Sequence, residues 1–401
     1  MTRVLIVGSG PAGASLAYLL ARRGIDVTLL ERQEGFGREF RGELLMPSGV
    51  EALEQMGLSK SFSVVPTELQ KSLSLYMNGE LVFNQELTGQ KFEEHPPQAV
   101  CQTKFLEMLV SEAAKSPSFR IKQGASVKAL LYEAGRVVGV RVRTKTGEEH
   151  LRSDLVIGAD GRASIVRKQG DFRAHHVSPP LDIVWLKLPC PQDWTGARLY
   201  MGSGHFLLGY RTWDGHLQLA WIIIKGTFGD LKDQGIEHWF QQMEAHVSPD
   251  LASHLRVQEG AIEKPFVLDA VSDCVENWSV PGALLIGDAA HTMSPVGGQG
   301  INIALRDAIV AANHMVPAIL DADPSRLTAA LLSIERERMP EVKKIQRLQG
   351  LPPRVGFSQA WWGEPVRTVV SRLARYSRVR LAAAGRLSEF PFGVTKVDLR
   401  V

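Results

Sequence analysis

Hydrophobic residues occur at the start of the chain in two short runs that flank a glycine-rich turn. Arg3–Val7 and Asp26–Leu30 are mainly apolar, rich in β-branched side chains and of strand length, which predicts two buried parallel strands. Between them the turn Gly8–Gly13 leads into a segment with helical composition, Pro11–Arg23, which Gly24 ends. The pattern therefore predicts strand, turn, helix and strand within the first thirty residues.

The middle of the chain carries further apolar runs that predict strands. Leu73–Leu87 alternates around Asn78-Gly79, a strong hairpin signal, and Leu155–Ile157 and Ala283–Ile286 are short buried runs like the first two. Closely spaced runs containing Trp and Tyr predict an antiparallel sheet rather than more βαβ units: Leu181–Leu188, Ala197–Tyr200, His205–Tyr210 and Leu217–Ile224.

Other segments have helical spacing of apolar residues. Ser48 and Glu51 predict a capping box for a short helix that Gly57 ends. Pro340 is expected to interrupt the last long helix, Pro324–Arg347. The remaining predicted helices are Thr103–Lys115, Gln234–His246 and Gln299–Met315.

These elements predict an α/β protein in which a Rossmann-like nucleotide-binding domain is interrupted by a mostly antiparallel β domain. A chain of 401 residues is long enough for more than one domain. We assign residues 1–72, 97–178 and 267–325 to the nucleotide-binding domain, residues 73–96 and 179–266 to a substrate domain, and residues 326–401 to a helical, basic C-terminal region.

The composition, 44% hydrophobic and 22% charged, is ordinary for a globular protein. Cys101, Cys190 and Cys274 are far apart and odd in number, which predicts neither a disulfide framework nor a metal site but reduced thiols in a cytoplasmic protein. No charged and apolar leader precedes the first strand and no apolar run approaches eighteen residues. We therefore expect neither export by such a leader nor a membrane span.

Positive charge is concentrated at the C-terminal end. Residues 335–401 carry a net charge of +8, whereas the rest of the chain carries −5. Arg367, Arg372, Arg375 and Arg378 alternate with apolar residues as on the solvated face of an amphipathic helix. This spacing favours an exposed face over contact with an anionic membrane surface, and argues against nucleic acid as a partner.

The glycines of the first turn have separate uses in a dinucleotide-binding unit. Gly8 permits the tight turn, Gly10 lets the backbone approach a pyrophosphate, and Gly13 lets the helix pack close to the strand. The free N–H groups at the helix start favour the charge of a pyrophosphate. Glu31 lies at the distance expected for a carboxylate that binds a ribose diol. An ordinary glycine-rich turn is the alternative, but the order of elements favours an adenine dinucleotide.

A second acidic motif comes after Leu155–Ile157. Asp160 and Gly161 stand just beyond this run, Ser164 can cap the segment C-terminal to it, and Arg167 directs a second polar group to the same place as Asp160. Taken alone, this segment is explained equally well by an Asx turn.

A third motif comes after Ala283–Ile286 and is more informative. Gly287 and Asp288 stand at the strand end, where Asp288 can hold a polyol hydroxyl. A Gly-Gly-x-Gly loop then opens a helix whose N–H groups between Gln299 and Asn302 suit an electron-rich group. A phosphate is one candidate. The anionic edge of a reduced flavin is the better one, because the first turn already accommodates phosphates.

In this order and spacing, the three motifs resemble those of the single-component FAD-dependent aromatic hydroxylases, the p-hydroxybenzoate hydroxylase superfamily of group A flavin monooxygenases. The resemblance implies non-covalent FAD, NADH or NADPH as co-substrate, and a reduced flavin that forms a C4a-hydroperoxide with O2 and hydroxylates an aromatic or electron-rich small molecule. It implies cofactor contacts at Gly8, Gly10, Pro11, Ala12, Gly13, Glu31, Arg32, Arg41, Gln102, Asp160, Gly287, Asp288, Pro295, Gly298, Gly300, Ile301 and Asn302.

The chain departs from some branches of that superfamily. Ser294 and Gly297 stand where ubiquinone-pathway hydroxylases usually have His and Ala, and the sequence lacks the elements typical of tryptophan halogenases and geranylgeranyl reductases. Two alternatives remain: a flavin oxidoreductase that is not an oxygenase, such as a reductase or halogenase, and a flavin-binding protein without turnover. The oligomeric state, monomer or homodimer, stays open.

Aromatic residues of the predicted sheet are candidates for a substrate pocket, although half-buried sheets contain the same residue types and both interpretations stand equal. These residues are Trp185, Tyr200, Tyr210 and Trp221, with Pro295 from the late loop.

His291 is expected to brace the loop of the third motif rather than act in hydrolysis, because the sequence contains no GxSxG elbow. We assign no catalytic acid, base or nucleophile. The charged loop Gly35–Leu45, which contains Arg41, is where we expect a gate for flavin movement.

Overall fold

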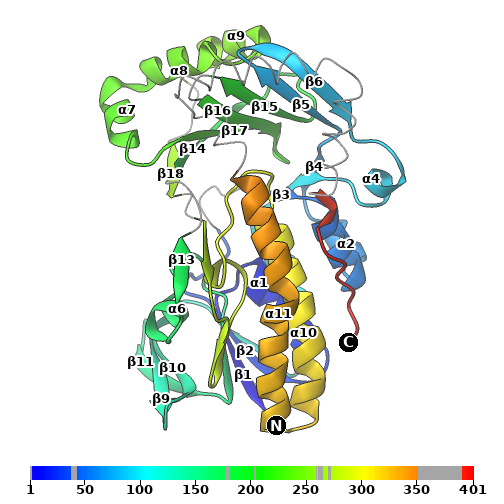
Figure 1. Cartoon of the computed structure of the whole chain (residues 1–401), viewed down its shortest axis with the longest axis vertical. Coiled ribbons are helices and arrows are strands. Elements are labelled where there is room, and N and C mark those ends of the chain that lie inside the picture. The colour runs from blue at the N-terminus through cyan, green and yellow to red at the C-terminus, as the bar shows by residue number, and fades with distance from the viewer. Residues whose placement is uncertain are drawn as a thin grey trace.

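The two apolar runs at the start of the chain form the centre of a six-stranded sheet. β1 (Arg3–Val7) pairs in parallel with β2 (Asp26–Leu30) on one side and with β12 (Leu155–Gly158) on the other. The outer strands are the parallel β8 (Phe119–Lys122) and β21 (Ala283–Leu285) and the antiparallel β20 (Ser279–Val280). The computed structural model, drawn in Figure 1, describes residues 2–37, 43–176, 181–202, 205–258, 260, 265–269, 272–350 and 391–401.

Helices and a small sheet cover the two faces of this sheet. α1 packs against α5 and α10 on one face, and β10 approaches β12 on the other. The helices are α1 (Pro11–Ala21), α5 (Gln102–Ala114) and α10 (Gly300–Leu320). The small antiparallel sheet comprises β9 (Ser126–Glu133), β10 (Arg136–Thr144) and β11 (Gly147–Arg152), and α6 (Ile165–Gln169) lies against β9.

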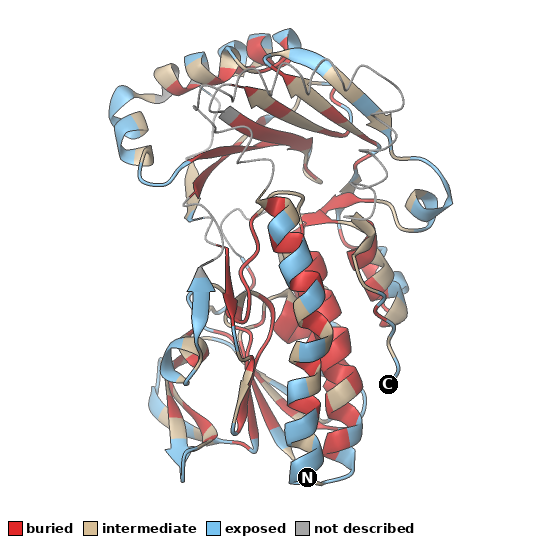
Figure 2. Cartoon of the chain, viewed as in Figure 1, coloured by how far each residue is buried: buried red, intermediate tan, exposed pale blue. Residues whose placement is uncertain are grey.

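Helix α10 is buried along most of its length (Figure 2). By length and hydropathy it could cross a membrane, which corrects the expectation that no apolar stretch is long enough. Arg306 and Asp307 interrupt the apolar run in the sequence. In the folded protein, 83% of the most apolar 18-residue segment of α10 is buried. α10 is therefore a core helix packed between α1 and α11.

The antiparallel sheet predicted for the middle of the chain is confirmed and has seven strands. It also takes in the predicted hairpin, whose turn residues Asn78 (φ 50°) and Gly79 (φ 80°) are both left-handed, as a tight primed turn requires. All neighbouring strands are antiparallel except the pair β15 and β5. The order across the sheet is β18 (Phe266–Asp269), β14 (Leu181–Pro189), β17 (His216–Ile224), β16 (His205–Arg211), β15 (Ala197–Gly202), β5 (Ser72–Met77) and β6 (Glu80–Glu86).

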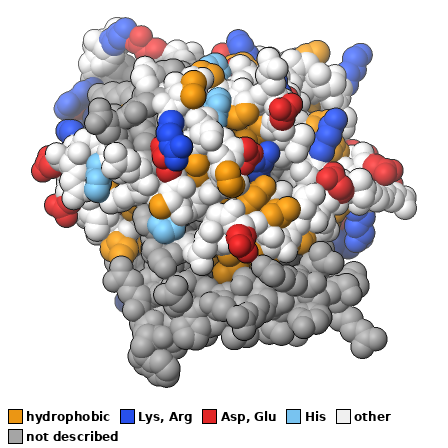
Figure 3. All heavy atoms as spheres, turned by 90° about the horizontal axis from the view of Figure 1, so that it is seen from above, with side chains coloured by type: hydrophobic (Ala, Val, Ile, Leu, Met, Phe, Trp, Pro, Cys, Tyr) orange, Lys and Arg blue, Asp and Glu red, His pale blue; other side chains and the backbone are white. Residues whose placement is uncertain are grey.

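Each face of the seven-stranded sheet has its own apolar core. The back face packs under α7 (Phe228–Gln234), α8 (Ile236–Glu244) and α9 (Pro249–Gln258). From that side, the described surface carries charged side chains of both signs with scattered hydrophobic groups between them (Figure 3). The front face packs with Leu44, Met46, Ala99 and Val296, which come from the part of the chain around the six-stranded sheet.

Short elements join the two large sheets. β3 (Leu44–Leu45), β7 (Gln98–Val100) and β4 (Thr67–Leu69) form a three-stranded sheet, so the end of the predicted loop Gly35–Leu45 is a strand. The remaining short elements are α2 (Pro47–Gln55), α3 (Ser59–Phe62), α4 (Gln90–Glu94), β13 (Ala174–His176) and β19 (Asp273–Val275).

The capping box predicted for α2 is wrong. α2 begins with Pro47 after Met46, and the buried hydroxyl of Ser48 has no hydrogen-bond partner among the residues that the structure describes. The backbone N–H of Met46 instead donates to the Asn302 side chain at 2.8 Å. Asn302, from the distant helix α10, thus accepts a hydrogen bond at the start of α2, where the sequence predicted a local cap.

The last long helix, α11 (Pro324–Gln349), continues through Pro340, contrary to the predicted interruption. Packing against α10 and buried ion pairs on both sides of Pro340 compensate for the missing N–H. The four arginines predicted to line an amphipathic helix lie outside the described residues. The end of the chain runs along α2 and α10, where Leu399 N–H donates to Gln55 and Arg400 N–H to Asn313.

Candidate active site

Four sequence-predicted residues meet at one edge of the six-stranded sheet. Gly8, Glu31, Asp160 and Gly287 each lie within three residues of the carboxyl end of a parallel strand. Ligands of open α/β sheets bind outside this edge. The topology therefore brings the three motifs together, as the sequence predicted.

The turn of the first motif leaves no room for side chains. A Cβ atom on Gly13 would lie 2.0 Å from the Gly8 carbonyl oxygen and 3.1 Å from the Ala159 Cβ. Gly8 has a φ of +99°, and a Cβ there would lie 2.5 Å from the Ala159 carbonyl oxygen. Gly13 is required because the helix start lies against the Gly8 carbonyl, and Gly8 is required because the chain before the second motif packs directly on it.

Polar groups around this turn suit a dinucleotide. The first N–H groups of α1 in this turn, at Ala12 and Gly13, have no partner among the described residues, as expected at a helix start. The buried Glu31 carboxylate accepts hydrogen bonds from Ser9, from both its N–H (3.1 Å) and its hydroxyl, and from the Gln33 N–H (2.9 Å). Arg32, the next predicted contact, is exposed.

The third motif packs on the first. A Cβ on Gly287 would lie 2.8 Å from the Ala12 Cβ, and a Cβ on Gly298 would lie 3.0 Å from the Leu44 Cβ. The N–H groups of Gly300 and Ile301, in the first turn of α10, have no partner among the described residues. A second helix start thus presents free donors near the first.

The side chain of Asn302 braces this arrangement. Its oxygen accepts from Met46 N–H, and its nitrogen donates to the Gly298 carbonyl at 2.7 Å and to the Leu44 carbonyl at 3.5 Å. Both side-chain groups of Asn302 are thus engaged within the protein, and its backbone is the freer group for the predicted cofactor contact. Pro295 is partly buried between Ser294 and Val296, whose carbonyls accept from the Gln349 side chain.

Arg162, which the motifs in the sequence did not single out, connects the second and third motifs. Its guanidinium donates to the Asp288 carboxylate at 3.2 Å, to the Met293 carbonyl at 2.9 Å and to the Asp269 carbonyl of β18 at 2.8 Å. The Asp288 side chain keeps 32% of its surface exposed. Its second oxygen can therefore still accept from a polyol.

Asp160 and Arg167 do not point at one place. The Asp160 carboxylate accepts hydrogen bonds from the Ser164 hydroxyl and from the Ile165 N–H at 2.6 Å, which caps α6. Arg167 turns away to Asp273, with a closest approach of 3.2 Å. The predicted capping role of Ser164 is present, since its hydroxyl accepts from the Arg167 N–H.

His291 is buried behind the third motif. Its imidazole contacts the Asp307 carboxylate at 2.7 Å, and Asp307 also accepts from the Gly287 N–H and from Arg338. Against the effect of burial, the charges of His291 and Arg338 lower the pKa of Asp307. This network ties the motif to α11, which agrees with the predicted bracing role.

The candidate pocket residues divide between the two faces of the seven-stranded sheet. Tyr200 and Trp221 belong to the core of the back face, where Tyr200 stacks on Tyr76 with ring centroids 4.7 Å apart. For these two residues the structure favours the core alternative over the pocket alternative. Trp185 and Tyr210 lie on the front face, and the Glu43 N–H lies 3.5 Å from the Tyr210 hydroxyl.

The front face also carries polar residues that the sequence patterns did not reveal. Lys187, Gln218 and Tyr210 lie directly opposite one another on β14, β17 and β16. The Gln218 side chain is fully buried, and neither of its amide atoms has a hydrogen-bond partner in the described part of the chain. The sequence did carry a signal for them: Lys187 and Gln218 are polar residues inside the otherwise apolar strands β14 and β17.

Glu43 lies above this row and has an unusual proton affinity. Burial raises the pKa of Glu43 to about 7, although the Lys187 ammonium acts in the opposite direction. Lys187 forms an ion pair with Asp214 in the β16–β17 turn. Against the effect of burial, hydrogen bonds from Lys187 and Thr212 lower the pKa of Asp214 to about 2. Two nearby carboxyls therefore differ widely in proton affinity.

Arg41 lies outside the described residues, as does the middle of the loop expected to act as a gate, residues 38–42. Gln102 begins α5, and its backbone N–H faces the Glu43 carboxyl. This contact places Gln102 at the junction between the two sheets.

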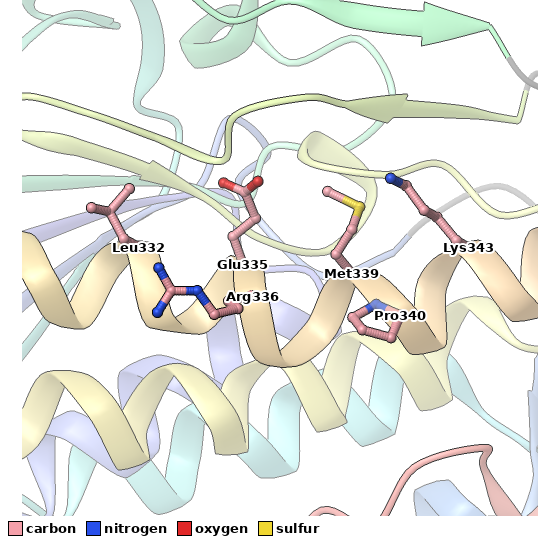
Figure 4. Close-up of a pocket in the computed structure, with 6 residues that line it drawn as sticks. All are labelled: Leu332, Glu335, Arg336, Met339, Pro340 and Lys343. Atoms are coloured by element: carbon pink, nitrogen blue, oxygen red, sulfur yellow. The ribbon is translucent and has the colours of Figure 1, made fainter.

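Two hollows lie away from the motifs. One, of about 440 Å³, runs along α11 and is lined by the residues drawn in Figure 4: Leu332, Glu335, Arg336, Met339, Pro340 and Lys343. The other, of about 700 Å³, lies between the β1–β2–β8 side of the six-stranded sheet and β11. Neither is lined by a motif residue, so we place the reaction at neither.

Comparison with known proteins identifies the cofactor. A family model described as an FAD binding domain matches residues 1–348. A 6-methylpretetramide 4-monooxygenase of Streptomyces rimosus is 30% identical over 383 residues, covering 94% of this chain and 91% of that protein. This chain belongs to the FAD-binding-domain family. It is an FAD-dependent monooxygenase, as its motifs predicted.

More distant relatives agree in fold. Squalene monooxygenase SE2 of Panax ginseng is 26% identical over 373 residues, and the match covers 86% of this chain but 64% of that protein. Among solved structures, p-nitrophenol 4-monooxygenase PnpA of Pseudomonas putida superimposes with a TM-score of 0.78 at 15% identity, covering 99% of this chain and all of that one. PqsL of Pseudomonas aeruginosa superimposes with a TM-score of 0.72 at 23% identity, covering 94% and 99%.

The described residues fit FAD. At Gly8 and Gly13 there is no space for a side chain. The backbone of the turn can therefore lie directly against a pyrophosphate. Glu31, at the end of β2, could accept from a ribose, and the partly exposed Asp288 from the ribityl chain. The first turn of α10 would then offer its N–H groups to the flavin ring.

Proposed function

We propose that NADH or NADPH reduces non-covalently bound FAD and that one oxygen atom of O2 is then inserted into an aromatic or otherwise electron-rich small molecule. Bound FAD would supply the electron transfer and the activated oxygen. The chain's own residues bind, orient and exclude water. The observation that carries the proposal is the apolar and aromatic front face, which packs with the same segments that contact the third motif.

The α10 start has the charge that reduced FAD requires. A helix N-terminus stabilises a nearby anion by about 0.3–2 kcal/mol. The N–H groups of Gly300 and Ile301 would hold the electron-rich edge of the ring, and Gly298 and Leu44 fix the loop that carries them. Reduction is favoured at such a site because the reduced ring is the more negative form.

The substrate would lie between the front face and this helix start. The apolar side chains of that face, among them Phe206, Leu208 and Ile222, would keep water from the reacting groups. The name of the Streptomyces relative, and that of PnpA, support an aromatic substrate for this chain as well.

Isotopically labelled O2 tests the reaction. Purified holoenzyme is supplied with NADH or NADPH and a panel of phenols and polycyclic aromatics, and products are analysed by mass spectrometry. We expect NAD(P)H consumption coupled to one labelled oxygen atom in a product. Reduction or halogenation of a substrate without label would instead assign the chain to the non-oxygenating flavin oxidoreductases.

We further propose that the enzyme works in the cytoplasm as a monomer or homodimer, without nucleic acid and without a stable membrane contact. The three free cysteines support a reducing compartment. Light scattering of the purified protein and fractionation of cells would test both statements.

A further inference from the structure

Near the end of the chain, residues 394–400 form an extended segment that lies over α2 and α10, and we call this segment the strap (red in Figure 1). Val397 and Leu399 pack against the core, whereas Lys396 between the two helices' contacts is exposed. No described strand pairs with the strap. Its backbone N–H and carbonyl groups therefore need partners from side chains.

Two side-chain amides supply most of these partners. Gln55, the last residue of α2, accepts from the Leu399 N–H at 2.8 Å and donates to the Val397 carbonyl at 3.0 Å. Asn313 of α10 forms the same pair of bonds, both at 2.7 Å, one residue further along the strap. Each amide thus takes the place of a neighbouring strand, and the strap ties the end of α2 to α10.

The other end of the strap contacts buried ions. The Val394 N–H donates to the Glu341 carboxylate at 2.9 Å, and the Thr395 carbonyl accepts from the Arg306 guanidinium. Just before the strap, Gly393 has a φ of +83°, and a Cβ there would lie 2.8 Å from the Cζ of Arg306. Only glycine lets the backbone pass so close to this guanidinium.

These ions lead directly to the third motif. Glu341 pairs with Arg338, which donates to the Asp307 carboxylate at 2.8 Å, and Asp307 accepts from the Gly287 N–H at 3.0 Å. The side chains of Arg306, Asp307, Arg338 and Glu341 are each 3% exposed or less. Removing one partner from such a buried network is costly, because the remaining charges stay desolvated. A continuous series of polar contacts therefore joins the strap to Gly287.

We propose that the strap is a positioning element of the FAD site. When it is docked, it supplies the last partners of Glu341 and Arg306, and the completed network holds Gly287 in the geometry that binds FAD. When it is undocked, these ions lose partners and admit water, and the third motif loosens. Gly287 also packs on Ala12 of the α1 start, so this loosening reaches the first motif as well. The role concerns cofactor binding and is independent of the substrate and of the oxygen chemistry.

The first test compares the same new side chain on the two sides of the strap. Val397→Asp places a carboxylate in the core, whereas Lys396→Asp places it where the wild-type side chain is 85% exposed. In fluorescence titration of the full-length apoprotein with FAD, Val397→Asp should raise the Kd at least about fivefold and Lys396→Asp should not change it. A Val397→Asp apoprotein that is folded by circular dichroism and keeps the wild-type Kd would overturn the proposal.

The second test acts on the contact with Arg306 and decides the matter if Val397→Asp does not fold. Gly393→Ala should raise the Kd for FAD, because the new methyl group pushes the strap away from the guanidinium. Gly226→Ala is the matched control: Gly226 has a φ of +88° but no neighbouring atom within 4 Å of the added Cβ. Equal Kd values for the two glycine variants would refute a role of the strap.

The third test uses the reciprocity of linked equilibria. If docking of the strap strengthens FAD binding, FAD must strengthen docking by the same factor. In wild type, FAD should therefore slow hydrogen exchange of the Val394, Leu399 and Arg400 N–H groups at least about fivefold. A strap that only stabilises the fold would exchange equally with and without FAD, and this result would overturn the proposal.

The same measurement follows the route of the coupling. In FAD-free Val397→Asp, the Gly287 N–H should exchange faster than in FAD-free wild type, because its acceptor Asp307 belongs to the network that the strap completes. The N–H groups of β9, which lies in the separate three-stranded sheet, should exchange as in wild type. Unchanged exchange at Gly287 would refute positioning through the ion network.

Discussion

Replacing Gly13 by alanine should weaken FAD binding more than any other single methyl group added to a glycine of the chain. The new Cβ would lie 2.0 Å from the Gly8 carbonyl oxygen, more than an ångström closer than ordinary contact allows. The Gly8 carbonyl is backbone, and the other neighbour, the Ala159 Cβ, belongs to the core, so neither can turn aside. Helix α1 must therefore move away from β1 to relieve the clash. Its N–H groups move with it, away from the pyrophosphate.

Overpacking of this kind costs typically about 1–3 kcal/mol. If the whole cost falls on the bound state, the Kd for FAD rises about 5- to 160-fold. Gly13→Val, which adds two more methyl groups, should abolish binding.

Fluorescence titration of apoprotein with FAD measures this effect, and thermal unfolding of the apoprotein shows whether the variant is folded. Gly229→Ala is the control, because Gly229 lies exposed on α7 with open space around it. Its Kd should not change. An unchanged Kd in Gly13→Ala, with folded apoprotein, would refute the argument that close packing of helix and strand forms the cofactor turn.

Three further predictions concern the cofactor and the core. Asp288→Ala should raise the Kd for FAD about 10- to 150-fold through the loss of hydrogen bonds to a charged group, and unchanged affinity would remove the ribityl assignment. Acid precipitation should release yellow FAD into the supernatant; flavin retained in the pellet would indicate a covalent bond and point to His291. The charges of Arg338 and Arg306 lower the pKa of the fully buried Glu341 to about 2 against the effect of burial. Ionised Glu341 should therefore contribute about 3 kcal/mol to the free energy of unfolding above about pH 4.5, and this contribution should disappear as the pH falls towards 2. In urea unfolding, Glu341→Gln should accordingly lose less stability in acid than the wild type does.

Local signals were sufficient wherever a feature depends on neighbouring residues. The turn Gly8–Gly13, the hairpin at Asn78-Gly79 and the acid after β2 were all predicted, because each is specified by backbone conformations within a few positions. The order of the three motifs was enough to identify the family and therefore the fold. Parallel strands then place these motifs at one edge without any further information.

Features that depend on which distant segments meet were missed or misassigned. Alternation along β15 and β17 separates two faces but does not tell which face the loop of the third motif will cover, so core and pocket stayed equal alternatives for Tyr200 and Trp221. Ser48 read as a cap because Asn302 is 254 residues away. In the same way, Glu43 is an ordinary acidic residue until burial at the junction of the two sheets raises its pKa.

The difference has a physical reason. A tight turn or a helix start is decided by steric limits on φ and ψ and by hydrogen bonds that span a few residues. The proton affinity of Glu43 and the unpaired amide of Gln218 arise from desolvation and from charges supplied by other strands, and these exist only after the sheets have formed in their register. The sequence alone thus determined the order and the edge at which the three motifs meet, and tertiary packing decided which side chains each face of the seven-stranded sheet presents.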